Sequence, residues 1–472
     1  MAQGKGKYIK ATGLYTIGNI FNRAISLLLL PIFTRLLSTS SYGIVNTYNS
    51  WVTIATVIVG LQLYLTLRSA ITDYNDRLNQ YISSITFLTS CAFVTILSIS
   101  AFVSTFFIKK LPVVLVVLCV IHAFMHAIIN IELQREMMTC EYVKRTLLLI
   151  LPNLIGAVLG IVIITTFPKT DYMGRIVSNV AVYIVFGLLF IIINFKNGKT
   201  YFNKDMWKYG LVLSTPLIFH GLASDILSSV DRTMITGFRS ASETGIYGVA
   251  YTMGMAIKVI TSSVESVWIP WFTKAMNENR KKDINNIASK YLIIVSCLCL
   301  SAMMCLPEVL KLFADKRYWT GVNIIPPIVL ASFITFLYSI SVDVEYYFKA
   351  TKGIAINTVI AAGSNLILNI IFIPKYGAIA AAYTTVVSYF ISFLIHYFSS
   401  KRLDKELFPI RFYILPLLLA ISGTIITYIF MGNWYIRWAI ALLILIIGFG
   451  VFYQHRKSLP ISDIIHKRKE KK

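Results

Sequence analysis

Ionisable side chains interrupt several of the most apolar stretches of this sequence. Arg23, Asp225, Arg232, Lys258 and Glu265 each lie inside a hydrophobic stretch long enough to cross a bilayer as a helix. A charge at the centre of a membrane helix costs about 2.5–3.5 kcal/mol on insertion scales, so such residues mark candidate binding or transport sites. The basic residues would attract an anionic group. The acidic residues would hold a coupling cation or neutralise their basic neighbours.

Further polar side chains extend these charges into stripes. Residues three, four or seven positions apart share one helix face. Four such sets are Asn19, Asn22, Arg23 and Ser26; Asn46, Asn49, Ser50, Thr53 and Thr56; Asp225, Ser228, Ser229 and Arg232; and Lys258, Thr261, Ser262 and Glu265. Because isolated charges avoid lipid, the stripes predict a wet cavity. The alternative is that Asp225 pairs with Arg232 and Lys258 with Glu265, and that the polar residues only hold helices together.

Other ionisable residues have more than one interpretation. Asp343 and Glu345 fall within roughly two turns of the end of the apolar stretch 323–348, which predicts a solvated vestibule or a site for a coupling ion. Asp231 lies on a different face from Asp225, and we expect solvation at a helix end. His122 and His126 have a spacing that can bind a metal, but no third ligand accompanies them. We therefore expect packing roles for both histidines and no metal site.

The composition excludes a separate soluble enzyme. Of the 472 residues, 57% are hydrophobic and 14% are charged, and the mean hydropathy is +0.71. Soluble domains have about 25% charged residues. The net charge of +23 requires no nucleic-acid partner, because it follows from basic cytoplasmic loops and their attraction to anionic lipid headgroups. The expected fold class is all-α, a polytopic membrane protein.

Apolar stretches of span length repeat almost from end to end. They predict about fourteen transmembrane helices, at 12–36, 42–66, 82–106, 113–133, 146–167, 175–195, 209–236, 245–269, 288–311, 323–348, 354–374, 377–399, 412–431 and 436–454. With the N-terminus inside, the inner segments hold 30 of the 44 lysines and arginines and the outer segments hold 11. The positive-inside rule therefore predicts that both termini are cytoplasmic.

Two hairpins of the sequence resemble each other. Residues 34–48 (TRLLSTSSYGIVNTY) and 237–251 (GFRSASETGIYGVAY) both pass from an arginine through a small polar turn to a Tyr-Gly pair. They lie six spans apart, which predicts parallel repeats about an axis along the membrane normal. The predicted organisation is a six-helix N-lobe at 1–200, a pseudo-symmetric six-helix C-lobe at 201–400, and two extra helices with a basic tail at 401–472. Chance recurrence of Tyr-Gly in a tyrosine-rich chain is the alternative.

Three segments carry a resemblance to a known superfamily. They are NIFNRAISLLLLPIFTRLLSTSSYGIVN (19–46), DRTMITGFRSASETGIYGVAYTMGMAIKVITSSVESVWIPWFTK (231–274) and NLILNIIFIPKYGAIAAAYTTVVSYF (365–390). With the span count, they resemble bacterial oligosaccharide flippases of O-antigen and capsule assembly, within the multidrug/oligosaccharidyl-lipid/polysaccharide exporter superfamily. The resemblance implies an alternating-access transporter in the bacterial plasma membrane. Its substrate would be an undecaprenyl-diphosphate-linked oligosaccharide.

The resemblance also implies roles for particular residues. Arg23 matches a cavity arginine of related lipid II flippases, whereas Tyr251 stands where a second arginine is expected there. This difference favours a sugar-repeat flippase over a lipid II flippase. Arg23, Lys258 and Arg232 would attract the diphosphate, while Asn19, Asn22, Asn46 and Asn49 would bind sugar hydroxyls. The last two spans would hold the lipid tail, as they do in the relatives.

The remaining expectations concern coupling, partners and rival functions. H⁺ or Na⁺ would be coupled at Asp225, Glu265, Asp343 or Glu345, unless these residues only balance charge, and we expect no cofactor. Membrane lipids and the polysaccharide polymerase and assembly machinery are the expected partners. The rivals are a lipid II-type or multidrug exporter of the same superfamily, and an enzyme such as a polysaccharide polymerase or ligase. Short outer connections and the missing nucleophile–base pair argue against an enzyme.

Overall fold

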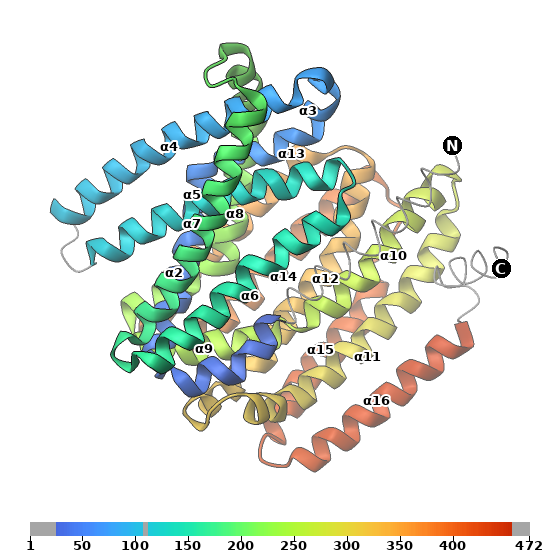
Figure 1. Ribbon diagram of the computed structural model, residues 1–472. Helices are drawn as coiled ribbons and strands as arrows, with labels where there is room; N and C mark the ends of the chain where they lie inside the picture. Colours follow the sequence, from blue (N-terminus) through green and yellow to red (C-terminus); the bar gives the residue numbers. More distant parts are fainter. Residues whose placement is uncertain (1–24, 107–111, 456–472) are drawn as a thin grey trace, which may run out of the picture. The chain divides into compact units, whose positions relative to one another are not determined.

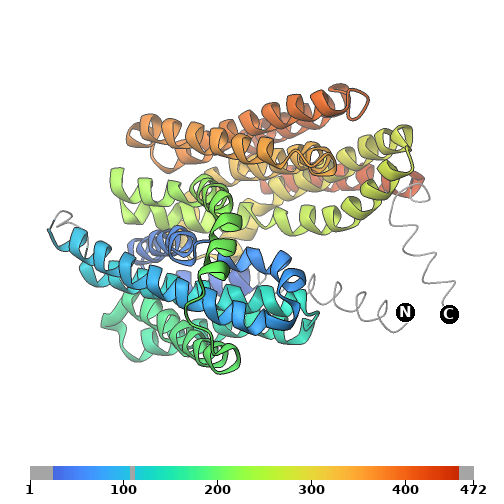
Figure 2. The ribbon, with the colours of Figure 1, turned by 90° about the horizontal axis from the view of Figure 1, so that it is seen from above.

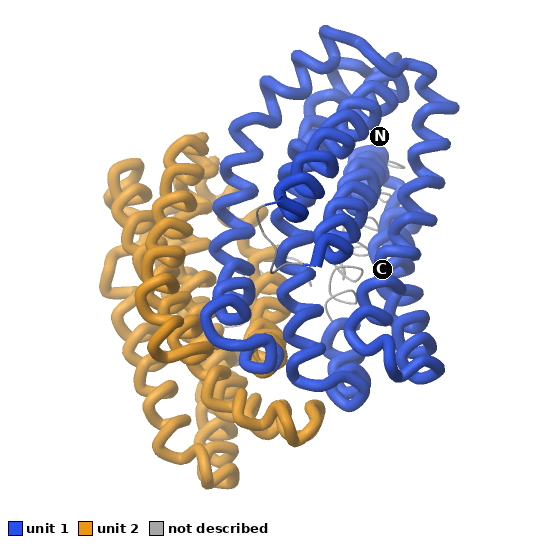
Figure 3. The backbone as a smooth tube through the Cα atoms, turned by 90° about the vertical axis from the view of Figure 1, so that its left-hand side faces the viewer, with its two compact units in different colours: residues 1–245 blue, residues 246–472 orange. Residues whose placement is uncertain are grey.

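The protein is built from helices, in agreement with the predicted fold class. The computed structural model describes residues 25–106 and 112–455, and these residues contain no strand. Contacts divide the chain into two compact units, residues 1–245 and 246–472 (Figure 3). The predicted lobes at 1–200 and 201–400 were drawn from sequence repeats rather than from contacts, and they stay a prediction.

Unit 1 is a bundle whose centre is α5, an apolar helix that packs against α2, α4 and α7 (Figure 1). Helix α2 also packs against α8, and α6 packs against α7. Buried apolar side chains of α4 and α5 form a continuous core with the residues that follow α2. The elements are Ile25–Leu36, α2 (Thr39–Gly60), η1 (Leu63–Thr66), α3 (Leu67–Asp73), η2 (Asn75–Arg77), α4 (Leu78–Phe106), α5 (Val113–Met138), α6 (Tyr142–Thr166), η3 (Pro168–Thr170), α7 (Asp171–Gly198) and α8 (Lys204–Phe238).

Unit 2 is organised around two long helices, α11 and α12. Helix α12 packs against α14, and α11 packs against both α15 and α16. Helices α13 and α14 run side by side (Figure 2). The elements are α9 (Ala241–Gly254), which begins at the end of unit 1, α10 (Ile257–Asn277), α11 (Lys281–Phe313), η4 (Lys316–Ile324), α12 (Ile325–Tyr347), α13 (Thr351–Tyr376), α14 (Ala378–Leu403), α15 (Arg411–Ile429) and α16 (Trp434–His455).

Eleven helices of the described residues are long and apolar enough to cross a membrane, or twelve if the bent pair formed by α2 and the segment Leu63–Asp73 is one span. The chain is therefore a multi-pass membrane protein. Predicted span 12–36 lies partly outside the described residues, and span 245–269 falls on α9 and α10, which are separated by a turn. The count of fourteen and the cytoplasmic termini stay predictions.

Two glycines permit a close crossing of α2 and the start of α9. A Cβ atom on Gly43 would overlap the carbonyl oxygen of Ala241, and a Cβ atom on Gly245 would overlap that of Thr39. Each glycine lies five residues after a serine that caps the start of its helix. Ser38 Oγ accepts from the Ser41 N–H, and Ser240 Oγ accepts from the Glu243 N–H. The contact therefore pairs Gly43 with Gly245. The sequence repeat pairs Gly43 with Gly248, three residues later in the chain.

A buried arginine fixes the last helix to unit 2. The Arg437 side chain is 0% exposed and pairs with Glu308 of α11. Its guanidinium also donates to the carbonyl oxygens of Met304 at 2.7 Å and Phe430 at 3.0 Å. Because these acceptors come from α11 and from the end of α15, one side chain holds the hairpin of α15 and α16 against α11.

Candidate functional site

A polar cavity lies inside unit 1, between α2, α5 and α8. Its volume is about 300 Å³, and its described lining residues include no lysine or arginine. The polar side chains that line it are Thr53, Thr56, Gln62, Tyr64, His126, Asn130, His220, Ser224 and Asp225. Hydroxyls, carboxamides, imidazoles and one carboxylate thus surround a single space. Such a set both donates and accepts hydrogen bonds, as the hydroxyls of a sugar require.

The cavity forms where the second span breaks. Helix α2 ends at Gly60, and the chain bends by 55° into the segment that begins at Leu63. Leu61 and Gln62 both adopt left-handed backbone conformations, with φ of 49° and 51°. Irregular backbone at membrane depth is tolerated where it is buried in protein or lines a cavity. A Cβ atom on Gly221 would overlap the Gln62 carboxamide, so this glycine lets the broken segment lie against α8.

The predicted polar stripe of α2 is only partly directed at this cavity. Thr53 and Thr56 line it, whereas the Asn46 amide donates to the Tyr42 carbonyl oxygen at 3.0 Å. Asn49 is exposed. Asn19, Asn22 and Arg23 lie outside the described residues, so the first stripe stays a prediction.

The residues of the predicted polar stripe on α8 do not all face the cavity. Asp225 lines the cavity, while the Arg232 guanidinium donates to the Ser228 carbonyl oxygen and lies 3.6 Å from the Asp231 carboxylate. The expectation that Asp231 is solvated at a helix end is wrong, because its side chain is only 3% exposed. The neighbouring guanidinium and the Arg232 N–H, which donates at 2.8 Å, stabilise the buried carboxylate.

Both predicted histidines have packing contacts. His122 is buried, with its ring against Tyr48 and Tyr183. His126 lines the polar cavity with its Nδ1 atom 3.4 Å from Thr56 Oγ1. Among the described residues, no group of three or more potential ligands could hold a metal ion.

The acidic residues of unit 2 gather where α10 meets α12. Ser339 donates to Glu265 at 2.7 Å, and the Trp268 indole donates to Asp343 at 3.0 Å. Glu265 and Asp343 are close enough to interact electrostatically, and both interact with Tyr291 of α11. Lys258 lies half-buried on α10, one face-repeat before Glu265. The two carboxylates thus share one region, where a cation would relieve their repulsion.

Glu345 has a different environment from the one predicted. The solvated vestibule is wrong for this residue, because Glu345 is 0% exposed and its carboxylate lies 2.7 Å from His396 Nδ1. Dense packing of α12 against α14 excludes water from the pair. Asp343, two residues earlier, is half-buried.

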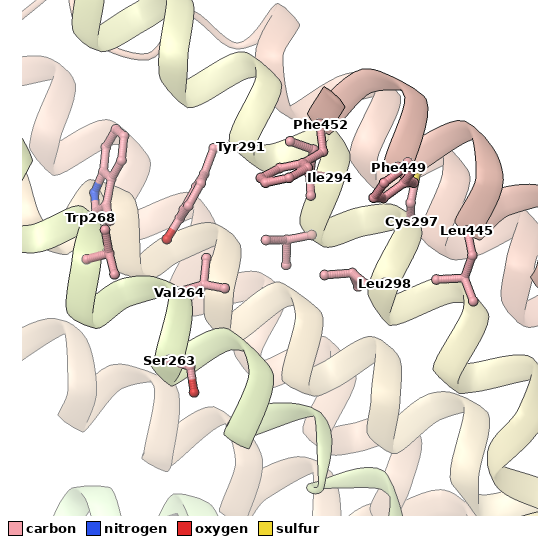
Figure 4. A pocket seen from close by; sticks show the side chains of 13 residues that line it. Ser263, Val264, Trp268, Tyr291, Ile294, Cys297, Leu298, Leu445, Phe449 and Phe452 are labelled. Carbon is pink, nitrogen blue, oxygen red and sulfur yellow. The ribbon is translucent and has the colours of Figure 1, made fainter. Parts of the chain in front are cut away.

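An apolar pocket lies in unit 2 between α10, α11 and α16 (Figure 4). Its volume is about 490 Å³. Phe449 and Phe452 of α16 lie opposite Ile294 of α11, and Val264 of α10 forms another side. Its few polar groups are the hydroxyls of Ser263 and Tyr291, the Trp268 indole N–H and the Cys297 thiol. The shape and chemistry suit hydrocarbon.

Several residues of these sites escaped prediction from the sequence. His220 and Asn130 give no strong local signal, although Asn130 follows His126 by four residues on one face of α5. His396 lies in an apolar stretch and becomes notable only beside Glu345. Arg437 was counted with the outer loops, but its guanidinium is buried. A lone arginine at the start of a span is the one available signal of such an anchor.

Comparison with known proteins agrees with this architecture. The chain is 23% identical over 406 residues to a capsular polysaccharide biosynthesis protein of Staphylococcus aureus, which covers 82% of this chain and 98% of that protein. It is 24% identical over 213 residues to a protein of Haloferax volcanii named as a probable low-salt glycan biosynthesis flippase, with 43% of this chain and 42% of that one covered.

A solved structure of the lipid II flippase MurJ, in an inward closed conformation, shares the fold. The TM-score is 0.70 at 18% identity, over 93% of this chain and 99% of that one. At this identity the likeness concerns the fold, and it agrees with the all-helical membrane fold expected from the sequence. A family model described as polysaccharide biosynthesis protein matches residues 8–276, more than half of the chain. The chain belongs to this polysaccharide biosynthesis protein family.

Proposed function

We propose that this protein flips an undecaprenyl-diphosphate-linked oligosaccharide repeat unit across the bacterial plasma membrane, for the synthesis of a surface polysaccharide. The family and the flippase-like relatives support a transporter of lipid-linked sugar. The observation that carries the proposal is the apolar pocket beside α16, because a polyprenyl chain needs a hydrocarbon-lined site on its carrier.

The polar cavity of unit 1 suits the sugar end of this substrate. Its carboxamides, hydroxyls and Asp225 carboxylate can pair with sugar hydroxyls, and the Tyr64 ring offers an apolar face. The described residues of its lining include no lysine or arginine. We assign the diphosphate to Arg23, Lys258 and Arg232, which attract an anion in a low-dielectric environment.

The acidic residues supply candidates for ion coupling. Glu265 and Asp343 repel each other across α10 and α12, and this repulsion would favour uptake of one H⁺ or Na⁺. Asp225 and Glu345 are further candidates in the two units. Binding or release of the ion would bias the alternating-access equilibrium only if the two states differ in affinity for it.

A gene-deletion experiment tests the proposed function. Removing the protein from its host should abolish the surface polysaccharide and cause lipid-linked oligosaccharide to accumulate, and the wild-type gene should restore both. Arg23→Ala should fail to restore them although it inserts normally, because it removes the cation assigned to the diphosphate. The matched control is Lys204→Ala, at an exposed basic residue. Normal polysaccharide in the deletion strain would refute the function, and full restoration by Arg23→Ala would refute the assigned role of Arg23.

A further inference from the structure

A buried acid–base pair joins two helices of unit 2. Glu345 on α12 is 0% exposed, and His396 on α14 is 3% exposed. The Glu345 Oε2 atom lies 2.7 Å from His396 Nδ1, which is hydrogen-bonding distance. Burying two ionisable groups costs free energy that their mutual attraction only partly offsets. Ionisable residues inside membrane proteins are therefore functional candidates by default.

The surroundings of the pair decide how many protons it holds. The Asn357 amide nitrogen of α13 lies 3.4 Å from His396 Nδ1, and Tyr338 stacks on the imidazole with ring centroids 5.3 Å apart. The second carboxylate oxygen, Glu345 Oε1, is buried and has no hydrogen-bond partner within the described part of the chain. An ionised carboxylate would leave charge on this unpaired oxygen, whereas a protonated carboxyl would leave only a neutral carbonyl oxygen there.

The other titratable groups nearby do not supply a compensating positive charge. Among the described residues, His396 is the ion-pair partner that the structure gives Glu345. Lys352, at the start of α13, is exposed. The other titratable groups on helices packed against α12 and α14 include tyrosines and acids: Tyr338 and Asp343 on α12, Tyr389 and Tyr397 on α14, Tyr413 on α15, Glu265 on α10 and Tyr291 on α11. Those helices also carry basic residues, among them Lys258 and Lys274 on α10, Lys290 on α11, Lys401 and Arg402 on α14 and Arg411 on α15, but within the described part of the chain none of them forms an ion pair with Glu345. The Lys401 ammonium, the basic group nearest to His396 along α14, donates instead to the carbonyl oxygens of Lys405 and Leu407.

The charge balance of the pair follows from these contacts. With one proton between them, the imidazole is neutral and donates through Nδ1 to a carboxylate, and the pair has a net charge of −1. A second proton makes the pair neutral, either as a carboxyl that donates to Nδ1 or as an imidazolium–carboxylate pair. Sealed packing favours the neutral pair, because an uncompensated buried charge is costly.

We propose that Glu345 and His396 form the proton-binding site that couples this transporter to a pH gradient. The inference rests on the proposed flippase function and specifies its coupling ion. The extra proton stays bound while α12 and α14 are packed together. It leaves when the helices separate enough for water to solvate the remaining charge. Binding of the extra proton therefore favours the packed state of α12 and α14, and separation of these helices favours its release.

The test uses the full-length protein in membrane vesicles that contain lipid-linked oligosaccharide. Flipping is measured as the fraction of oligosaccharide that becomes accessible to a membrane-impermeant oxidant. An imposed pH gradient should change the wild-type initial rate roughly tenfold, within the range usual for coupled sites. A proton ionophore should remove this effect, and replacing Na⁺ with K⁺ should leave it unchanged.

Four variants test whether the response to the pH gradient depends on Glu345 and His396. Glu345→Gln and His396→Asn should each lose the dependence on the pH gradient, while Glu406→Gln, at an exposed carboxylate of the same unit, should keep it. The exchange Glu345→His with His396→Glu restores an acid–base pair and should recover the response, even if the single variants fold poorly. A pH response that survives in folded Glu345→Gln, or a folded exchange variant without one, would overturn the assignment.

The same assay distinguishes an error in the proposed proton site from an error in the proposed flippase function. Wild-type flipping that follows Na⁺ and ignores the pH gradient would overturn the proton site and leave the flippase intact. Vesicles in which the wild-type protein causes no exposure of oligosaccharide would refute the proposed function itself.

Discussion

The two cavities of this protein have opposite chemistry. The polar cavity of unit 1 has a volume of about 300 Å³ and is surrounded by hydroxyls, carboxamides, imidazoles and a carboxylate. The apolar pocket of unit 2 has a volume of about 490 Å³ and is surrounded by aliphatic and aromatic side chains. A substrate that is polar throughout would gain nothing from the second cavity, and a hydrocarbon would be excluded from the first. The contrast therefore favours an amphipathic substrate with a long apolar tail.

The two cavities also arise from different backbone features. The polar cavity forms at the break of α2, where Gly221 gives room for Gln62. The apolar pocket needs no broken helix, since α16 lies along α11 and is held there by Arg437. The first cavity thus depends on irregular backbone and small residues. The second depends on the anchoring of one terminal helix.

The largest expected effect is removal of the Arg437 anchor. Arg437→Ala removes the cation paired with Glu308 and the donor to the Met304 and Phe430 carbonyl oxygens. Breaking a buried pair by removing one partner costs about 3–5 kcal/mol. The helix α16 should detach and open the apolar pocket. The purified variant should therefore melt at a lower temperature. In a background without the other five cysteines, Cys297 should react faster with a lipid-soluble maleimide.

The control for this prediction is Arg411→Ala, which removes an exposed arginine at the start of α15. It should leave both the melting temperature and the Cys297 reactivity unchanged. Equal behaviour of the two variants would mean that α16 does not depend on Arg437.

An introduced carboxylate should destabilise the protein in the apolar pocket but not in the polar cavity. The expected loss of stability is slightly smaller than for Arg437→Ala. Val264→Asp adds a carboxylate to the apolar pocket, and a charge in an apolar membrane site costs about 2.5–3.5 kcal/mol. Thr53→Asp adds the same group to the polar cavity, whose hydroxyls, carboxamides and imidazoles can donate hydrogen bonds to a carboxylate. The first variant should be poorly inserted and unstable, as measured by membrane yield and thermal unfolding, and the second should resemble wild type. Equal losses would contradict the distinction between the cavities.

Asp225 should matter for transport and not for folding. Asp225→Asn keeps the shape and removes the negative charge, and we expect polysaccharide export to fall roughly tenfold, the equivalent of one charge-assisted hydrogen bond of about 1.4 kcal/mol. Asp205→Asn, at an exposed carboxylate of the same helix, is the matched control. The rate at which surface polysaccharide reappears after depletion measures the effect. If Asp205→Asn and Asp225→Asn slow export equally, the polar cavity is not the site of sugar binding.

The smallest effect is expected at Asp404, in the loop between α14 and α15, which lines neither cavity. Burial of this carboxyl favours its neutral form, but hydrogen bonds from Lys281 at 2.8 Å and from the Glu406 N–H at 3.0 Å hold its pKa below the ordinary value. The carboxylate therefore stabilises the folded state at neutral pH, and this contribution is lost as the pH falls through the lowered pKa.

Asp404→Asn should lower the melting temperature slightly at neutral pH, since such pairs near the surface contribute about 0–1 kcal/mol. The difference from wild type should vanish in strong acid. A difference that persists there would mean that the loop is stabilised by packing and not by this charge. Transport should be unaffected at neutral pH.

The sequence predicts the helices far better than it predicts their contacts. Predicted span 113–133 begins where α5 begins, at Val113, because hydropathy reports directly on the solvent of each segment. Asp225 and Glu265 stand out in the sequence, since a charge in an apolar stretch is visible without a structure, and their roles stay predictions. The bend at Leu61 and Gln62 was missed, because neither residue type is usual in a left-handed conformation.

Partners were the hardest feature to predict, because they depend on tertiary packing. Glu345 and His396 are 51 residues apart in sequence, and nothing in either local pattern connects them. The buried position of Asp231 was missed for a similar reason: its exposure depends on neighbouring helices and not on its distance from a helix end. Helix periodicity gives the face of a residue but does not tell what covers that face.

One photocrosslinking measurement tests the division of the substrate between the two cavities most directly. A photoreactive amino acid replaces Leu298 in the apolar pocket or Asn130 in the polar cavity, in cells that synthesise the lipid-linked oligosaccharide. Mild acid then cleaves the diphosphate linkage of each adduct. We predict that the polyprenyl chain remains on residue 298 and that the oligosaccharide remains on residue 130. Phospholipid alone at 298 together with no sugar at 130 would contradict the account.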